Sequence, residues 1–196
     1  SHFPAGQGQR VIMQWAQKDP RAALNYLQNN PQLKSEELMG RVLNNMISKF
    51  PLETIQLVED GKMEVSDFWG IHFFRDDSKV EEIVRALPTI NNKDLQSRLL
   101  HAVAQNKAEK DPLQGLAWID NYSEYEGYDN AVRNILSQMS QRDPQGAVAE
   151  LFNRQGNKNF ESTMHSLIHS WHRTDPQNLK SWLDNLPSGS QKDHVL

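Results

Sequence analysis

A helix-breaking Asp-Pro corner between two short amphipathic segments recurs along this chain, and it constrains the fold more than any other feature. In the copy at residues 166–187, Asp175 suits a helix N-cap, because its carboxylate can accept hydrogen bonds from the free N–H groups of the next turn. Pro176 suits the first helical position and forces the preceding helix to end. Apolar residues recur at helical spacing on both sides of the corner. This stretch therefore predicts an αα-hairpin.

The same kind of corner occurs in six places. Aligned on the first residue of the predicted second helix, the copies fall at Pro20, Pro51, Asp77, Pro112, Pro144 and Pro176. Phe50 replaces the capping aspartate in the second copy, and Asp77 replaces the proline in the third. A spacing of 26 to 35 residues between copies is typical of stacked supersecondary units.

Apolar residues recur in the same register around these corners. Nine residues before the corner stand Val11, Val42, Phe68, Val103, Ile135 and Leu167. Eight before stand Ile12, Leu43, Trp69, Ala104, Leu136 and Ile168. Five before stand Trp15, Met46, His72, Lys107, Met139 and Trp171, and seven after stand Leu27, Val58, Val84, Ile119, Leu151 and Leu183. Only His72 and Lys107 interrupt the columns. We therefore expect the tryptophans, Trp118 and Trp182 included, to pack between repeats rather than to bind a ligand.

The predicted fold class is all-α, a right-handed α-solenoid of about six helix-turn-helix repeats of about 32 residues. We expect one repeat domain over residues 1–196. Its repeats cover approximately residues 8–31, 35–61, 65–88, 93–122, 128–154 and 161–187, with the start of a further helix at 192–196. The chain opens without a methionine, and its last residues resemble the helix start at Lys93. We therefore expect a piece of a longer repeat protein.

Composition excludes several classes of function. A net charge of -4 argues against nucleic-acid binding, which needs phosphate-neutralising Lys and Arg on one face. No apolar run approaches the roughly 18–20 residues of a membrane span. The absence of cysteine excludes disulfides, thiol catalysis and thiolate metal sites. A cysteine-free chain rich in Asn and Gln fits an extracytoplasmic, periplasmic bacterial protein better than a cytoplasmic one.

Three histidines share one face of a predicted helix. His165, His169 and His172 are four and three residues apart, and imidazoles at such spacing can chelate zinc. The glutamate of a His-Glu-x-x-His metalloprotease motif is absent. We expect a solvated polar face, with part of a partner-binding surface and a zinc site as open alternatives, and we assign no metal and no cofactor to the chain.

Three tyrosines lie among acidic residues in the segment 120–129, which joins two repeats. A spacing of three could place Tyr122, Tyr125 and Tyr128 on one helical face packed against a neighbouring repeat. The alternative is an aromatic patch for a basic or peptide partner, because tyrosine is favoured at interfaces. The order of the acids is not that of a calcium loop.

Signatures of catalysis are missing. The chain has no Gly-rich phosphate loop, no Gly-x-Ser-x-Gly elbow and no cysteine nucleophile. We therefore predict that this protein is not an enzyme and assign no catalytic residue.

The hairpin length, the Asp-Pro corners and the columns of small and aromatic residues resemble tetratricopeptide-like and HEAT-like helical repeats. The Leu-Gly…Tyr pattern of the tetratricopeptide first helix has no counterpart at fixed spacing here. The resemblance is one of architecture, and it implies binding of a protein or peptide along a concave surface.

The sequence thus favours a non-catalytic interaction scaffold that binds a protein or peptide through an exposed helix face. The alternative is a superhelical accessory arm of a larger enzyme, comparable to the helical arm in some lytic transglycosylases. A HEAT-like nucleic-acid enzyme is disfavoured by the acidic balance.

Overall fold

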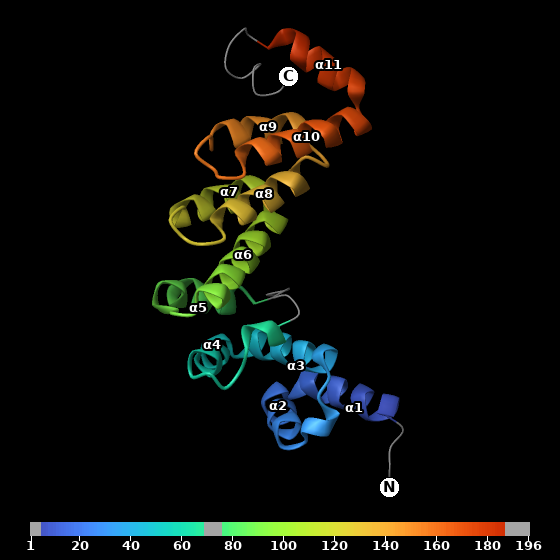
Figure 1. Cartoon of the computed structure of the whole chain (residues 1–196), viewed down its shortest axis with the longest axis vertical. Coiled ribbons are helices and arrows are strands. Elements are labelled where there is room, and N and C mark those ends of the chain that lie inside the picture. Colours follow the sequence, from blue (N-terminus) through green and yellow to red (C-terminus); the bar gives the residue numbers. More distant parts are fainter. Residues whose placement is uncertain (1–4, 69–75, 187–196) are drawn as a thin grey trace. The chain divides into compact units, whose positions relative to one another are not determined.

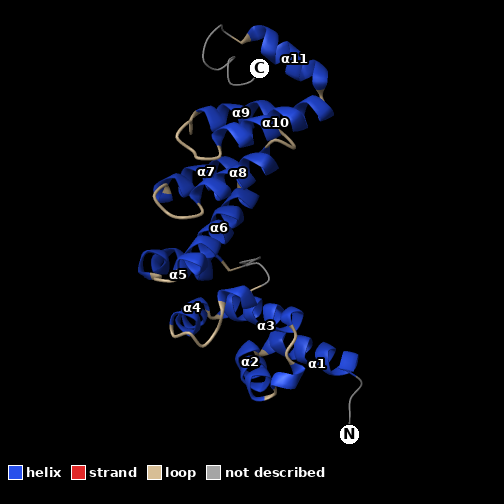
Figure 2. Ribbon diagram, viewed as in Figure 1, coloured by secondary structure: helices blue, strands red, loops and turns tan. Residues whose placement is uncertain are grey.

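The computed structural model of the chain describes residues 5–68 and 76–186, and every regular element within these ranges is helical (Figure 2). The α-helices, labelled in Figure 1, are α1 (Ala5–Lys18), α2 (Pro20–Asn29), α3 (Glu36–Lys49), α4 (Pro51–Glu59), α5 (Asp77–Ala86), α6 (Lys93–Lys110), α7 (Pro112–Ile119), α8 (Tyr128–Met139), α9 (Pro144–Phe152), α10 (Phe160–Thr174) and α11 (Pro176–Asn185). Short 3-10 turns are η1 (Pro31–Leu33), η2 (Val65–Asp67), η3 (Leu87–Thr89) and η4 (Asp120–Tyr122). The predicted all-α class is confirmed. Among the described helices, none has the length and apolarity to cross a bilayer.

All six predicted corners start a helix at the aligned residue. They open α2, α4, α5, α7, α9 and α11. Five of these helices are capped by the aspartate before them, as in α2 and α11, where Asp19 Oδ1 and Asp175 Oδ1 each accept from a backbone N–H at 3.0 Å. The side chain of Phe50 makes no capping bond at the start of α4, and its ring instead lies 3.6 Å from the Arg21 guanidinium carbon.

The chain divides into two compact units, residues 1–103 and 104–196. In the first unit α3 packs against α1 and α2 before it and against α4 after it, and α4 packs against α5. The fully buried side chains there include Leu27, Leu43, Met46 and Ile47. This unit therefore buries its core between successive helical hairpins, as apolar stripes on one helix face require.

The second unit repeats this arrangement. Helix α8 packs against α7 and α9, and α10 packs against α8, α9 and α11. Its core is formed by buried residues of all these helices, including Leu116, Val132, Leu136, Leu151 and Trp171. Within this unit each hairpin therefore packs on the one that precedes it.

The predicted apolar columns are fully buried at most of their described positions, but Val84, Met139, Ile168 and Leu183 are half-buried and two residues of α1 are exposed. The column nine residues before the corner is buried at Val42, Phe68, Val103, Ile135 and Leu167. Val11 is 59% exposed, however, and Trp15 is 37% exposed, so the prediction that tryptophans pack between repeats is wrong for Trp15. Within the described residues α1 packs against α2 and α3, and neither helix covers Val11 and Trp15. Trp69 and His72 lie outside the described residues.

Candidate functional site

An open cleft of about 1070 Å³ lies in the second unit, between two loops that occupy equivalent places in successive hairpins. One wall is the segment 120–130, which links α7 to α8. The other wall is the segment 150–159, which links α9 to α10. The two walls are joined directly, because Asp129 Oδ1 accepts from the backbone N–H of Lys158 at 3.1 Å.

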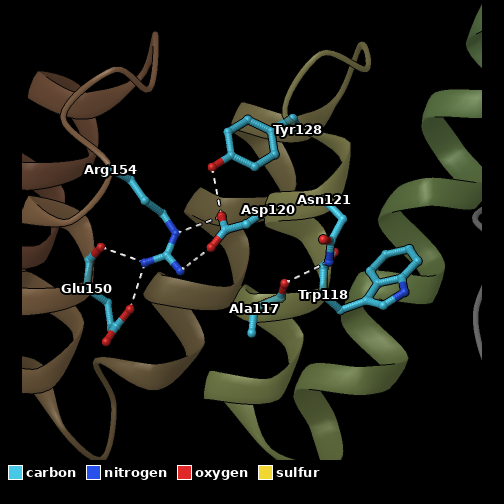
Figure 3. A network of polar contacts seen from close by, with 7 residues as sticks. All are labelled: Ala117, Trp118, Asp120, Asn121, Tyr128, Glu150 and Arg154. Carbon is cyan, nitrogen blue, oxygen red and sulfur yellow. Dashed lines mark hydrogen bonds and ion pairs between the residues drawn. The ribbon is translucent and has the colours of Figure 1, made fainter.

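A buried arginine fixes the inner end of this cleft. The Arg154 side chain is only 10% exposed, and its guanidinium donates two bonds to Asp120, Nε to Oδ1 at 3.0 Å and Nη2 to Oδ2 at 2.7 Å. Its Nη1 donates to Oε2 and to the backbone oxygen of Glu150, both at 2.7 Å. Figure 3 shows how the guanidinium bridges the end of α7 and the end of α9. Such two-pronged charge-assisted bonds are among the stronger and more directional polar contacts in proteins.

The hydrogen bonds and charges around Arg154 compensate for the burial of its guanidinium. Burial opposes the charge of Arg154, but hydrogen bonds and the charges of Asp120 and Glu150 outweigh it, so that the pKa of Arg154 is raised. The Tyr128 hydroxyl donates to Asp120 Oδ1 at 2.9 Å. Burial, the hydrogen bond to Asp120 and the charge of Asp120 raise the pKa of Tyr128 to about 12. The phenol is therefore protonated at neutral pH, and its hydrogen bond ties the start of α8 to the end of α7.

The charges of the cleft do not cancel. Five of the lining residues are acidic and two are basic. Two of the acids, Asp120 and Glu150, are used by Arg154, whereas Glu124 and Glu126 make no ion pair with any described residue. Both are exposed. The rim therefore carries negative charge that the folded chain leaves available, and such charge attracts cationic groups.

A buried amide in the cleft wall is only half satisfied. Asn157 is 7% exposed, and its Oδ1 accepts from the backbone N–H of Asn159 at 2.8 Å. Its Nδ2 has no hydrogen-bond partner among the described residues. A buried polar atom without a partner costs about 1–3 kcal/mol, and native structures contain few of them. The loop between α9 and α10 therefore contains one buried donor that the described chain leaves unsatisfied.

The three tyrosines do not share one helical face, so that prediction is wrong. Tyr122 ends η4, Tyr125 lies in a turn, and Tyr128 begins α8. Gly127 separates the last two with φ of 96°, a left-handed conformation that breaks the helical path. Tyr122 packs on Trp118, with ring centroids 4.6 Å apart, and all three tyrosines are half-buried. Tyr125 and Tyr128 line the cleft.

The three histidines do share one face of α10. All three side chains are exposed, and the rings of His165 and His169 lie parallel with centroids 6.3 Å apart. None of them lines the cleft, although His172 lines a smaller groove beside α11. Within the described part of the chain, no group of three or more His, Asp or Glu side chains is placed to hold a metal ion.

Sequence reasoning missed Arg154, Asp120 and Asn157. The sequence does carry a signal for the contact between Asp120 and Arg154. Asp120 follows its Asp-Pro corner by eight residues, and Arg154 follows the next corner by ten. Opposite charges at neighbouring positions of consecutive repeats indicate contact once the hairpins are stacked. Asn157 has no comparable signal, since its burial depends on how the loop folds.

Comparisons with known proteins find no matching family model, no similar curated protein and no similar solved structure. The resemblance to tetratricopeptide-like and HEAT-like repeats is therefore supported at the level of packed helices alone.

Replacing Arg154 by Met is expected to lower the free energy of unfolding by about 2 kcal/mol, because it leaves two carboxylates facing each other without their shared cation. The exposed i,i+4 pair of Arg41 with Glu37 provides the control. Arg41→Met should change stability by less than about 0.5 kcal/mol. Urea unfolding followed by circular dichroism measures both. An Arg154→Met variant as stable as the wild type would show that the network contributes nothing.

Proposed function

We propose that this chain is a non-catalytic scaffold of the α-solenoid type that binds a protein partner, and that its cleft holds an extended, basic segment of that partner. The recurrence of one helical hairpin in register, with each hairpin packed on the one before it within a unit, supports the solenoid. Its predicted right-handed twist belongs to the same proposal. Such arrays typically present repeated loops and helix faces to partners.

The cleft of the second unit is the observation that carries the proposal. Its size matches sites that bind ligands, but its wall is polar rather than apolar, which favours a hydrated, charged segment over an apolar small molecule. Glu124 and Glu126 are placed to attract Lys or Arg side chains.

The cleft also includes two of the three tyrosines that the sequence suggests as part of a partner-binding surface. Tyr125 and Tyr128 contribute aromatic walls, and aromatic side chains are enriched in interfaces. The loops need little rearrangement to bind, because Arg154 and Tyr128 already fix both walls. A site that is ordered before binding loses less entropy when the partner arrives.

Charge reversal at the rim tests this function. A short fluorescent peptide rich in Lys and Arg is expected to bind the protein in fluorescence anisotropy titrations, and a peptide of equal length rich in Asp and Glu is not. Joint replacement of Glu124 and Glu126 by Lys should weaken binding of the basic peptide by about tenfold or more, because two attractions become repulsions. Added salt should weaken binding by the wild type.

The matched control changes the same net charge elsewhere. Glu36 and Glu109 are exposed and lie outside the cleft. Joint replacement of these two by Lys should leave the affinity within about threefold, since distant exposed charges are screened. Equal losses in the two double variants would mean that only net charge matters, and the cleft would then not be the site.

A further inference from the structure

Two exposed histidines of α10 form a pair that is suited to chelate a metal ion. His165 and His169 are four residues apart, so their side chains lie one above the other on one face of the helix. Their rings are parallel, with centroids 6.3 Å apart. Neither residue lines the acidic cleft, so the pair is independent of the proposed binding site.

The helix that carries the pair is held in place by its other side. Phe160, Met164, Leu167 and Trp171 are buried, and α10 packs against α8, α9 and α11. The backbone that carries the two histidines is therefore ordered before an ion arrives, and only side-chain torsions have to be fixed on binding. Such a chelate loses less entropy than two imidazoles brought together from separate flexible segments.

The separation of the rings is close to that of two imidazoles on one ion. Zinc–nitrogen bonds of about 2.0–2.1 Å place the centroids of two imidazoles on a tetrahedral ion about 5 Å apart. The two rings therefore have to approach by about 1 Å and to turn their nitrogen atoms toward each other. Both side chains are exposed, so these rotations need no repacking of the core.

Packing of the hairpins does not require histidine at these two places. In α8 the same register positions hold Arg133 and Ser137, and in α6 they hold His101 and Gln105. Hairpins of the same kind therefore form with other side chains there. Imidazole is the side chain most often used to bind metal ions, so the pair in α10 has a capacity that its counterparts in α8 lack.

The third histidine of this helix face lies apart from the pair. His172 lines the groove beside α11, which neither His165 nor His169 lines. Within residues 5–68 and 76–186, no three His, Asp or Glu side chains are grouped to hold a metal ion. The pair is therefore a chelate with two protein donors, and water fills the remaining coordination positions of an ion bound there.

We propose that His165 and His169 together bind one divalent transition-metal ion, such as zinc. Each imidazole contributes one nitrogen lone pair, whereas hard cations such as calcium prefer oxygen ligands and bind such a pair poorly. Glu161 and Arg173 carry opposite charges one turn before and one turn after the pair. Their effects on a bound cation oppose each other, so the affinity depends mainly on the two imidazoles.

Isothermal titration with zinc chloride up to about 1 mM tests the proposal. The wild type is expected to bind zinc at a saturable site, to bind Cu²⁺ more tightly and not to bind Ca²⁺ over the same range. His165→Gln and His169→Gln should each weaken zinc binding by about tenfold or more, because a single donor replaces a chelate. Both positions are exposed, so the helical circular dichroism of each variant should equal that of the wild type.

His172→Gln is the matched control, because it removes an exposed histidine of the same helix that lies outside the pair. Its zinc affinity should stay within about threefold of the wild-type value. Thermal unfolding gives a second readout: zinc should raise the Tm of the wild type and of His172→Gln, and that of His165→Gln much less.

The absence of saturable zinc binding by the wild type overturns the proposal. Unchanged affinity in His165→Gln or in His169→Gln overturns it as well, since the ion would then not be shared by the two rings. A loss in His172→Gln equal to that in His165→Gln would also contradict the assignment of the site to this pair.

Discussion

Trp171→Ala is expected to lower the free energy of unfolding by about 3–5 kcal/mol, the range found when a large buried aromatic side chain is truncated. Trp171 is 1% exposed and packs against Trp182 across the last hairpin. It also occupies the column that joins α10 to α8 and α9. Truncation therefore leaves a cavity between two hairpins as well as within one. Urea unfolding followed by circular dichroism at the helical minimum measures the loss.

Two further variants test whether the lost stability depends on the burial of the side chain or follows from the removal of any large apolar side chain. Trp15 stands in the same column, but it is exposed, so Trp15→Ala should cost less than about 1 kcal/mol. Trp171→Phe should lose less than Trp171→Ala, because it keeps a ring and removes the indole Nε1, which has no partner among the described residues. Equal losses at Trp15 and Trp171 would contradict the role assigned to the column.

The contrast between Trp15 and Trp171 shows which features of the fold can be predicted from the sequence and which cannot. The corners were predictable because they depend on contacts within one turn, namely an aspartate cap followed by a proline that needs no N–H. The columns were predictable because burial recurs with the repeat. The exposure of Trp15 was not, since its own residue type and register are those of a buried residue. What distinguishes it is the packing of α1, which contacts α2 and α3 without either helix covering Trp15.

The cleft was harder to predict from the sequence than the fold was. The bond between Asp120 and Arg154 joins residues 34 positions apart and exists only because two hairpins stack. The path of the tyrosine segment depends on Gly127, whose left-handed φ separates Tyr125 from Tyr128 and sends the chain into α8. Spacing alone favoured one continuous helix there. Loop conformation and contacts between repeats, rather than helix formation, therefore decide the candidate site.

Gly115→Ala is expected to destabilise the second unit by about 2–3 kcal/mol, although alanine favours helices over glycine by about 1 kcal/mol. Gly115 lies in α7, where a Cβ would stand 2.6 Å from Ala108 Cβ, 2.8 Å from its Cα and 2.9 Å from its backbone nitrogen. No side-chain rotation relieves a clash with the backbone of α6. The two helices would have to move apart, which loosens the corner at Asp111 that they share.

A second helical glycine, at which alanine should raise the stability rather than lower it, provides the control. Gly8 lies in α1, and a Cβ there would have no atom within 4 Å. Gly8→Ala should therefore stabilise the protein by about 0.5–1 kcal/mol, the helix propensity alone. Adding Ala108→Gly to Gly115→Ala should restore part of the lost stability, because it removes the Cβ that the new methyl group meets. Stabilisation by Gly115→Ala similar to that by Gly8→Ala would mean that α6 and α7 do not need their close approach.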